Sequence, residues 1–311
     1  MEDVYISPKD IPTAQNYDVR TSSFFQDHEE LPTPEEVRSR ARTQYLSGKL
    51  WGWKGRRVTD GYNGRPVPAV FEEMNLFVKW GCEVEISEAQ VLYVIRNNLG
   101  DSVPVPEIYG WRVDGDEKFL YMEVINGKTM EEQWAELEED DRLRICSQLR
   151  TILENLRRLR QPLNQEFVGN IIRKNYREKA LFLDSQSGTG PFTSVKSFHD
   201  WYIQQYKRML SDPETVPEPY RAKLPDSSQI TFTHGDLHRS NIILTPSEPR
   251  KVAAIIDWEQ SVWLPAYWED CKARWTASYS GEWVVDYLPL IIDHDENIRE
   301  AWQYYTDPVG S

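Results

Sequence analysis

A polar loop enclosed by two short apolar segments constrains this chain more than any other feature. The loop carries Asp236 and Asn241 and runs into the apolar residues 242–244, and a second apolar run, Val252–Ile256, ends at Asp257. If the two runs pair as adjacent antiparallel strands, Asn241 and Asp257 come to neighbouring ends. An amide oxygen and a carboxylate there can hold a hard divalent cation, for which Mg²⁺ is the best candidate. Asp236 is then left to accept a proton from a hydroxyl group.

Lys79 and Glu88 form a second charged pair. Lys79 follows three apolar, strand-like residues, and the capping-box pattern Ser87-Glu88-Ala89-Gln90 predicts a helix that ends near Gly100. The apolar stripe of that helix consists of Leu92, Ile95 and Leu99. Glu88 stands four residues before Leu92 and therefore lies on the same buried-facing stripe. A carboxylate on that face requires a cationic partner.

Together these residues supply the parts of phosphoryl transfer. In that chemistry a base orients the nucleophile, oxygen ligands hold Mg²⁺ on the phosphates, and a lysine paired with a helix glutamate holds the phosphates from the other side. Asp236 fits the base, and Asn241 and Asp257 fit the metal ligands. Lys79 and Glu88 fit the remaining pair. Either Asp236 or Asn241 alone would be explained more simply as a turn or cap residue, but the complete set favours catalysis.

The order of the predicted elements indicates an α+β chain with two lobes. Strand-like segments and few helices fill the chain to about residue 125, and helices predominate after it. The strand-like run Phe119–Ile125 is followed by Asn126-Gly127, a turn signal. The two lobes should therefore join near residues 123–127.

Three further capping patterns predict where helices begin. Thr33-Pro34 precedes a helix that should run to about Leu46, and Thr129 with Glu132 forms another capping box. Ser197 is expected to cap a helix rich in aromatic residues.

Composition excludes several classes of protein. The chain has 311 residues, with 36 Lys and Arg against 50 Asp and Glu, so a net charge of −14 opposes a nucleic-acid partner. The apolar runs are too short for a membrane span, and the N-terminus has no secretory signal pattern. Three scattered cysteines favour a reducing compartment, and we expect a cytoplasmic protein. The acidity either attracts a cationic substrate or only keeps the protein soluble.

The sequence resembles the aminoglycoside phosphotransferase-like family of small-molecule kinases, related to choline kinase, and especially its fungal-type members. The resemblance extends from about residue 77 to residue 275. Its three blocks are Phe77-Val78-Lys79-Trp80-Gly81 with Ser87-Glu88-Ala89, Val103–Gly110 with Leu120–Gly127, and His234-Gly235-Asp236-Leu237-His238-Arg239-Ser240-Asn241 with Ile256-Asp257-Trp258. The third block is highly specific, whereas the first alone would be weak.

The resemblance implies a protein-kinase-like bilobal fold with ATP between the lobes. Residues 1–122 would form a small β-rich N-lobe with an N-terminal arm and helix, 123–127 a hinge, and 128–311 a larger, mainly helical C-lobe. The adenine would lie against the backbone of Glu123–Ile125. These expectations make the chain an ATP- and Mg²⁺-dependent small-molecule kinase.

The resemblance also implies a role for each site residue. Lys79 would contact the α- and β-phosphates and Glu88 would fix Lys79. Asp236 would be the base, while Asn241 and Asp257 would bind Mg²⁺.

Several features depart from the protein-kinase pattern. No GxGxxG precedes Lys79; the candidates for the phosphate loop are the glycines at 55, 61 and 64, or the turn Met74-Asn75. The catalytic loop reads His-Gly-Asp, and Asp257 is followed by Trp-Glu with no Ala-Pro-Glu anchor after it. The segment that docks peptides is therefore missing, and a small-molecule acceptor is favoured.

The residues around the catalytic loop have simpler interpretations too. His234 should brace the loop backbone, and Glu259 should make a local salt bridge. His238 either faces the acceptor or lies on the loop surface, and Arg239 should be exposed or brace the loop.

Aromatic residues after Asp257 either line an acceptor site or pack helices. They are Trp263, Tyr267, Trp268, Trp275, Tyr279 and Trp283. An aromatic wall can bind a cation or a planar ring, and Glu269, Asp270 and Glu282 could attract an amine. A cationic or aromatic acceptor is weakly favoured.

Three other functions remain open from the sequence. The chain could be a non-catalytic, pseudokinase-like nucleotide-binding protein, a protein kinase with an atypical substrate loop, or an enzyme that uses the nucleotide for another outcome such as acyl activation.

Overall fold

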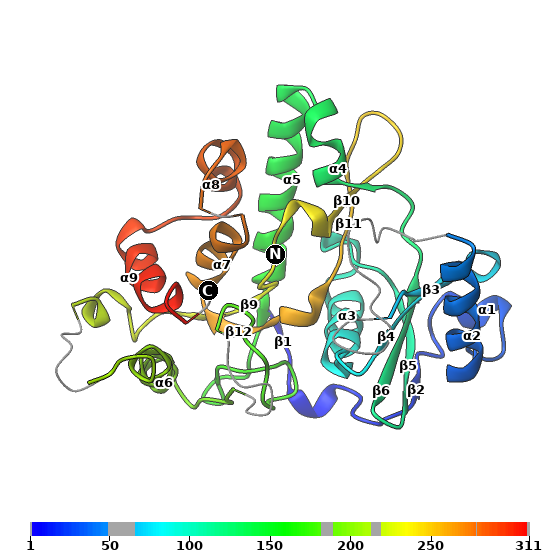
Figure 1. The fold of residues 1–311 in the computed structure, drawn as a ribbon, viewed down its shortest axis with the longest axis horizontal. Coiled ribbons are helices and arrows are strands. Elements are labelled where there is room, and N and C mark those ends of the chain that lie inside the picture. Colours follow the sequence, from blue (N-terminus) through cyan, green and yellow to red (C-terminus); the bar gives the residue numbers. More distant parts are fainter. Residues whose placement is uncertain (1, 49–65, 182–188, 213–218, 278, 310–311) are drawn as a thin grey trace.

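A five-stranded antiparallel sheet forms one end of the molecule (Figure 1). The computed structural model describes residues 2–48, 66–181, 189–212, 219–277 and 279–309. The strand order is β2-β5-β6-β4-β3. The strands are β2 (Tyr17–Asp18), β3 (Ala69–Phe71), β4 (Leu76–Gly81), β5 (Ile108–Asp114) and β6 (Glu117–Glu123). The candidate glycines at 55, 61 and 64 lie outside the described residues.

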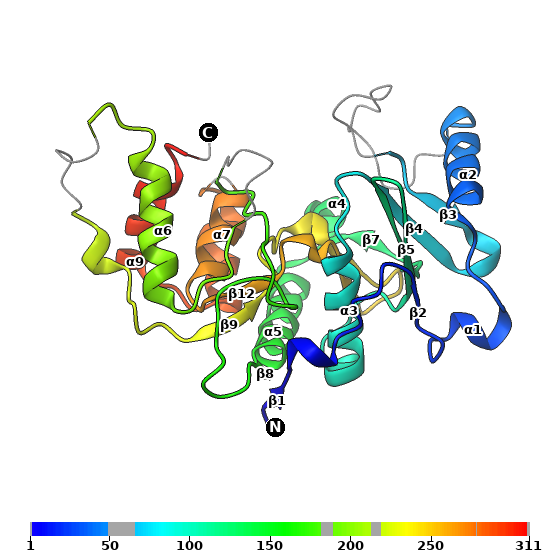
Figure 2. The ribbon, with the colours of Figure 1, turned by 90° about the horizontal axis from the view of Figure 1, so that it is seen from below.

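The two faces of this sheet pack against different helices. Side chains alternate along a strand, so in β6 Leu120 and Met122 join the core that contains α3 (Ile86–Leu99), whereas Phe119 and Tyr121 join the core on the opposite face. That opposite face is covered by α2 (Pro34–Leu46). Figures 1 and 2 show α3 between the sheet and the rest of the molecule.

The remaining helices form a second lobe around the long helix α5 (Glu139–Leu156) (Figure 2). The core of the sheet lobe continues through α3 to Leu149 and Leu153 of α5. A separate aromatic-rich core joins three helices further along the chain, α6, α7 and α9. The other α-helices are α1 (Phe24–Asp27), α4 (Met130–Gln133), α6 (Val195–Lys207), α7 (Trp268–Thr276), α8 (Leu288–Ile291) and α9 (Glu296–Thr306), and a π-helix spans Trp283–Tyr287. The predicted α+β class with a sheet lobe and a helical lobe is confirmed.

Short strands in the second lobe carry the polar loop. The antiparallel pair β9 (Ile230–Thr233) and β12 (Val262–Pro265) lies before and after it. The strand β10 (Ile242–Leu244) pairs with β11 (Val252–Ile255) and with β7 (Lys128–Thr129), antiparallel in both cases. The predicted pairing of the two apolar runs is therefore confirmed.

The N-terminal arm reaches the second lobe. Its first strand, β1 (Val4–Tyr5), runs parallel to β8 (Leu159–Arg160), which follows α5. The sequence did not indicate this contact, because two-residue strands carry no periodic pattern.

The predicted hinge, residues 123–127, starts at the last residue of β6 in the five-stranded sheet and ends just before β7 of the three-stranded sheet β11-β10-β7. Gly127 packs against the carbonyl of Leu244, where a Cβ atom would clash. Glycine is needed there because only its bare backbone allows such a close approach. The lobe boundaries themselves stay predictions.

Two of the four predicted helix starts are confirmed. Thr33 with Glu36, and Thr129 with Glu132, form complete capping boxes. The prediction for Ser87 is wrong, because α3 begins at Ile86 after Glu85, and no side chain caps it. The prediction for Ser197 is also wrong: Ser194 is the N-cap of α6, and Ser197 lies in the first turn as its capping-box partner.

None of the helices in the described part of the chain is both long and apolar enough to cross a membrane.

Candidate active site

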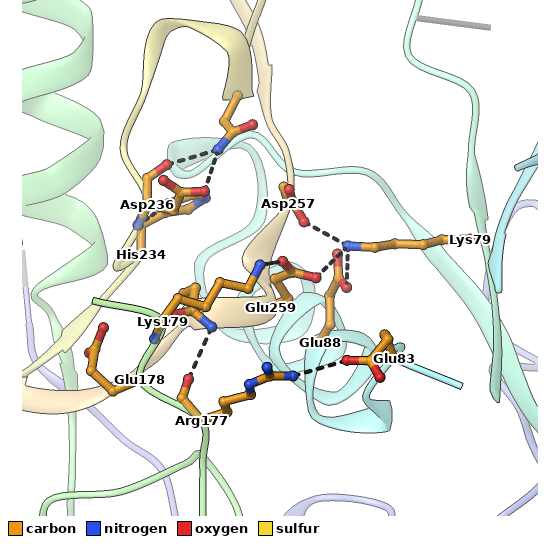
Figure 3. Close-up of polar contacts among 12 residues, drawn as sticks. Lys79, Glu83, Glu88, Arg177, Glu178, Lys179, His234, Asp236, Asp257 and Glu259 are labelled. Atoms are coloured by element: carbon orange, nitrogen blue, oxygen red, sulfur yellow. Dashed lines mark hydrogen bonds and ion pairs between the residues drawn. The ribbon is translucent and has the colours of Figure 1, made fainter. Parts of the chain in front are cut away.

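Lys79 joins the two lobes at one point (Figure 3). Its Nζ lies 2.7 Å from Oε2 of Glu88, 2.6 Å from Oδ1 of Asp257 and 3.2 Å from Oε2 of Glu259. The alternation of side chains along β4 explains why Lys79 points toward Glu88. Val78 belongs to the core under α2, so Lys79 faces the opposite side of the sheet, where α3 presents Glu88. The helical stripe predicted that Glu88 has a cationic partner, and the pairing of Glu88 with Lys79, expected from the kinase pattern, is present in the structure.

The group around Lys79 is largely removed from water. The Glu88 and Glu259 side chains are only 3% and 6% exposed. Glu259 also pairs through Oε1 with Lys179. Glu259 therefore forms salt bridges as expected, but the prediction that they are local is wrong, because Lys79 and Lys179 lie 180 and 80 positions away in the chain. Carboxylate oxygens of Glu88, Asp257 and Glu259 lie within 4.8 Å of one another. Such a trio can bind a metal ion, but here the ammonium of Lys79 contacts all three carboxylates.

Asp257 has a left-handed backbone, with φ of 64° and ψ of 58°. This conformation costs a residue with a Cβ about 1–3 kcal/mol and is concentrated at functional sites. Asp257 lies two residues after the end of β11 and is the N-cap of the 3₁₀ turn Trp258–Gln260. Trp258 stabilises the turn, because its Nε1 donates to the carbonyl of Ile255 at 2.8 Å. The bend allows Asp257 and Glu259 to reach the same lysine.

Asp236 lies in a loop whose backbone is held by several hydrogen bonds. Its amide donates to Nδ1 of His234 at 3.2 Å, and its carbonyl accepts from the His238 amide at 2.8 Å. The side-chain nitrogen Nδ2 of Asn241 donates both to the backbone carbonyl of Asp236 at 2.9 Å and to its Oδ2 at 3.1 Å. Asn241 thereby orients one carboxylate oxygen, and the geometry suits a group that accepts a proton from a ligand through the other.

His234 braces the catalytic loop, as expected. Its ring is fully buried; Nδ1 accepts from the Asp236 amide, so Nε2 is the atom that donates, to the carbonyl of Ile256 at 3.0 Å. The edge of Trp258 packs against the ring at 4.6 Å between centroids. The ring therefore ties the loop of Asp236 to the strand end that carries Asp257.

Glu269, on α7, stabilises the loop by accepting hydrogen bonds from its backbone, a role that the sequence did not predict. Its two carboxylate oxygens accept from the amides of His234 at 2.6 Å and Gly235 at 3.1 Å. Burial raises the pKa of Glu269, and the His234 side chain and the two amide donors oppose that shift. Glu269 was expected to attract an amine, which is wrong, because the carboxylate is buried and already bonded.

The backbone conformation and the close packing at position 235 explain why glycine stands between His234 and Asp236. Its φ is +74°, and a Cβ atom there would lie 2.5 Å from the carbonyl oxygen of Gln260. A side chain such as arginine therefore has no room at this position.

Asn241 and Asp257 lie at neighbouring strand ends, as predicted. Ile242 pairs with Ile255, and the Ile256 amide donates to the carbonyl of Asn241 at 2.9 Å. Because the Asn241 amide nitrogen is bonded to Asp236, its side-chain oxygen faces away from that carboxylate. A carboxylate and an amide oxygen are the ligands that Mg²⁺ prefers, so the donor set fits this ion.

Glu123 and Ile125 lie in the connection between the lobes. Glu123 ends β6, and its Oε2 accepts from the Glu107 amide at 3.2 Å. Next to it, the Val124 amide donates to the carbonyl of Asn75 at 3.3 Å. The turn Met74-Asn75, considered as a phosphate-loop candidate, therefore contacts the predicted hinge.

A cavity of about 380 Å³ opens beside the catalytic loop. His238 and Arg239, which follow Asp236, line it together with Trp134 and Trp283. Trp134 was not predicted, because nothing in its local sequence marks a site so far from the loop. The other lining residues are Thr276, Ala277, Ser280, Gly281 and Glu282.

The aromatic residues after Asp257 divide between packing and lining. Trp263 is fully buried in the core that extends from the sheet lobe through α3 and α5, and Trp268 is fully buried in the aromatic-rich core of α6, α7 and α9. Trp283 lines the cavity although it is also largely buried.

Asp270 and Glu282, which the sequence suggested could attract an amine, form hydrogen bonds and ion pairs with other side chains. Asp270 accepts from Arg274 at 2.8 Å, and Glu282 binds Nε1 of Trp134 at 3.1 Å and Arg142 at 2.9 Å. The Asp270 carboxylate is buried and holds the fold together, whereas the Glu282 side chain is 49% exposed and lines the cavity, so attraction of an amine by Glu282 stays a prediction.

A comparison with protein families agrees with this arrangement of two lobes around a kinase-type site. The model of the phosphotransferase enzyme family matches residues 86–289, which is more than half of the chain. No curated protein matches the sequence.

Several solved structures align with most of this chain at low sequence identity. The aminoglycoside phosphotransferase APH(4)-Ia has 12% identity and a TM-score of 0.49, over 87% of this chain and 92% of that one. A thermostable mutant of it, in a ternary complex with AMP-PNP and hygromycin B, has 13% identity and a TM-score of 0.49, over 86% and 90% of the two chains. The streptomycin-ATP-APH(2")-IIa complex has 13% identity and a TM-score of 0.44, over 89% and 97%.

The fold and the site define a protein-kinase-like bilobal enzyme. The chain belongs to the phosphotransferase enzyme family and is a small-molecule kinase. The narrower assignment to fungal-type members stays a prediction.

Proposed function

We propose that this protein is an ATP- and Mg²⁺-dependent phosphotransferase that acts on a hydroxyl group of a small molecule, with Asp236 as the base. The observation that carries the proposal is the position of Lys79. This lysine, from the sheet lobe, contacts Glu88 of α3 and Asp257 of the helical lobe. A site that spans both lobes explains such a contact, and ATP is the ligand that occupies this position in kinase chemistry.

Each predicted residue has a role in this proposal. The adenine lies against the backbone of Glu123–Ile125, and Lys79, oriented by Glu88, contacts the α- and β-phosphates. Asn241 and Asp257 would hold Mg²⁺, which neutralises charge on the phosphates. When ATP binds, Lys79 exchanges its contact with Asp257 for phosphate oxygens.

Asp236 orients the acceptor and accepts its proton. The loop around Asp236 is fixed by His234, Asn241 and the buried Glu269 before any ligand arrives. Such preorganisation lowers the barrier because the reacting groups need no rearrangement in the transition state.

The acceptor is a small molecule. The chain lacks the Ala-Pro-Glu anchor of protein kinases, and the cavity beside the catalytic loop has a volume of about 380 Å³, enough for a metabolite. The tryptophans of the cavity support an aromatic acceptor. A cationic acceptor, which the net charge of −14 weakly favours, is a second candidate. All three cysteines are free thiols, which is compatible with a cytoplasmic enzyme.

Calorimetric titration with ATP tests the nucleotide site. The wild type should bind ATP much more tightly with Mg²⁺ than without it, and Asp257→Ala should remove that difference. ATP that fails to bind under any condition would overturn the proposal.

Turnover tests the base. In an acceptor screen that detects ADP release and phosphorylated product, Asp236→Asn should retain Mg-ATP binding and lower turnover by about 10²–10⁴-fold. Unchanged turnover in this variant would remove Asp236 from the mechanism. Release of AMP would indicate acyl activation, and phosphate on added protein would indicate a protein kinase.

A further inference from the structure

The cavity beside the catalytic loop contains a cation, Arg239, that forms no ion pair with a carboxylate of the described residues. The Arg239 guanidinium lies 4.9 Å from the ring centre of Trp134 and 5.8 Å from that of Trp283. Within the described residues it makes no hydrogen bond, and no carboxylate comes within ion-pair distance. Its Nε is buried without a hydrogen-bond partner, and burial lowers the pKa of Arg239. A guanidinium whose Nε is buried without a hydrogen-bond partner carries a desolvation cost that an oxyanion of a ligand would offset.

The acids nearest to Arg239 do not serve as that partner. Glu282 is already bonded to Trp134 and Arg142. Glu131 is exposed, and its closest basic group is Nε2 of His238, at 4.0 Å. Both carboxylates act on Arg239 only through space, so the N–H groups of Arg239 stay available to an oxyanion of a ligand, although Glu282 also lines the cavity and the chain as a whole has a net charge of −14.

The two tryptophans hold the guanidinium in place. Trp134 and Trp283 pack edge to face, with ring centres 5.4 Å apart, and Trp134 is fixed by its bond to Glu282. Arginine stacked on aromatic faces keeps its N–H groups free for planar oxyanions, which it binds through two parallel hydrogen bonds. The cavity thus combines apolar walls with one rigid donor fork.

We propose that the acceptor carries a carboxylate, or another planar oxyanion, which binds Arg239, while its apolar body lies against Trp134 and Trp283. Arg239 is three residues from Asp236, so an acceptor anchored there presents a hydroxyl group from the other end of a short molecule. This inference rests on the proposed function and narrows it, because a purely cationic acceptor would be repelled by Arg239. In this role Arg239 contacts the substrate and determines specificity.

Three matched probes test the inference: hydroxymethylbenzoate, its carboxamide, and the corresponding hydroxymethylbenzylamine. They share the ring and the hydroxyl group and differ in charge. Binding is measured by NMR in the presence of the non-hydrolysable nucleotide AMP-PNP and Mg²⁺, and phosphorylation by ADP release with ATP. The variants are Arg239→Met, which keeps the stem, and Arg239→Lys, which keeps the charge. Arg20→Met, at an exposed arginine of the sheet lobe, is the matched control.

The wild type and Arg20→Met should bind the acid at least about tenfold more tightly than the amide, as a charge-assisted hydrogen-bonded pair predicts. Arg239→Met should lose this preference, and Arg239→Lys should keep part of it. Equal or tighter binding of the amide or the amine by the wild type would overturn the inference. So would a preference for the acid that survives in Arg239→Met, or binding of none of the probes.

The ATP titration separates this inference from the proposed function. If Mg-ATP binds and Asp236→Asn lowers turnover, but the acid is not preferred, only the oxyanion inference fails. If Mg-ATP does not bind, the proposed function fails, and the acceptor role of Arg239 fails with it even if the acid still binds.

Discussion

Oε2 of Glu259 lies 3.2 Å from Nζ of Lys79, while Oε1 of the same carboxylate binds Lys179. Glu259 therefore holds a lysine of the sheet lobe and a lysine of the helical lobe with one side chain. A second pair in the same region, Glu83 and Arg177, has a similar separation of 2.9 Å but is exposed, with 63% and 58% of the two side chains accessible (Figure 3). The Glu259–Lys79 pair and the Glu83–Arg177 pair differ mainly in burial.

Replacing Glu259 by glutamine should destabilise the protein, whereas replacing Glu83 should not. Glu259→Gln removes a buried counter-charge from two lysines, and the expected loss is about 1–3 kcal/mol in the free energy of unfolding. Glu83→Gln removes an exposed ion pair and should change that free energy by less than about 0.5 kcal/mol. Urea denaturation of both variants and the wild type measures the difference. Equal losses of unfolding free energy in the two variants would show that burial does not determine how much these ion pairs stabilise the protein.

Gly235→Ala should be far more harmful than the same substitution at another glycine with a left-handed backbone. Gly115, in the turn between β5 and β6, has a φ of +61° and open space where a Cβ would be, whereas Gly235 would place its Cβ 2.5 Å from Gln260. Gly115→Ala carries only the backbone cost of about 1–2 kcal/mol. Gly235→Ala adds a clash with the backbone beside the catalytic loop, so we expect a loss above about 3 kcal/mol.

Denaturation curves and turnover of the two alanine variants check this prediction. Gly115→Ala should keep the turnover of the wild type, and Gly235→Ala should lose it together with stability. A Gly235→Ala enzyme as stable as Gly115→Ala would mean that the loop can move away from Gln260.

His199 should make stability depend on pH between about 5 and 7. The ring is fully buried; Nδ1 lies 2.7 Å from Asp226 and Nε2 lies 2.7 Å from the Tyr267 hydroxyl. Burial lowers the pKa of His199, and the hydrogen bond to Asp226 opposes this shift only in part. The ordinary pKa of histidine in the unfolded chain is about 6.5.

The pKa of His199 is lower in the folded state than in the unfolded chain. As the pH falls below about 6.5, the unfolded chain therefore binds more protons at this residue than the folded protein does. The free energy of unfolding should therefore decrease as the pH falls from about 7 to about 5, and it should be insensitive to this group above that range. His199→Gln should reduce the slope, as measured by urea denaturation at several pH values. An unchanged slope in His199→Gln would assign the pH dependence to other groups.

Local patterns were sufficient to predict several parts of the site. Glu88 was placed on a buried helix face by the spacing to Leu92 alone, and Asp257 was placed beside Asn241 by the pairing of two apolar strands. Both predictions depend on short-range periodicity, which the chain expresses within a few residues. The start of α3 was predicted too late for a similar reason: a capping pattern at Ser87 exists in the sequence, but the chain does not use it.

Contacts between distant segments could not be predicted. Glu269 supports the amides of His234 and Gly235 from a helix 35 and 34 residues further on, and Trp134 stacks on Arg239 across the helical lobe. Their types and local spacing are those of ordinary helix residues, so no local signal distinguishes them.

The types of residue that perform the chemistry, and the strands and helices on which they lie, follow from the amino-acid pattern alone, because strand and helix periodicities decide which side chains share a face. Which carboxylates surround Lys79, which acids are already bonded, and that Arg239 forms no ion pair among the described residues follow only from the way the chain packs in three dimensions. Those properties depend on burial and on the meeting of segments far apart in the chain, such as Lys79 and Asp257, which are separated by 178 positions. A side chain acquires its electrostatic surroundings only when these segments pack together.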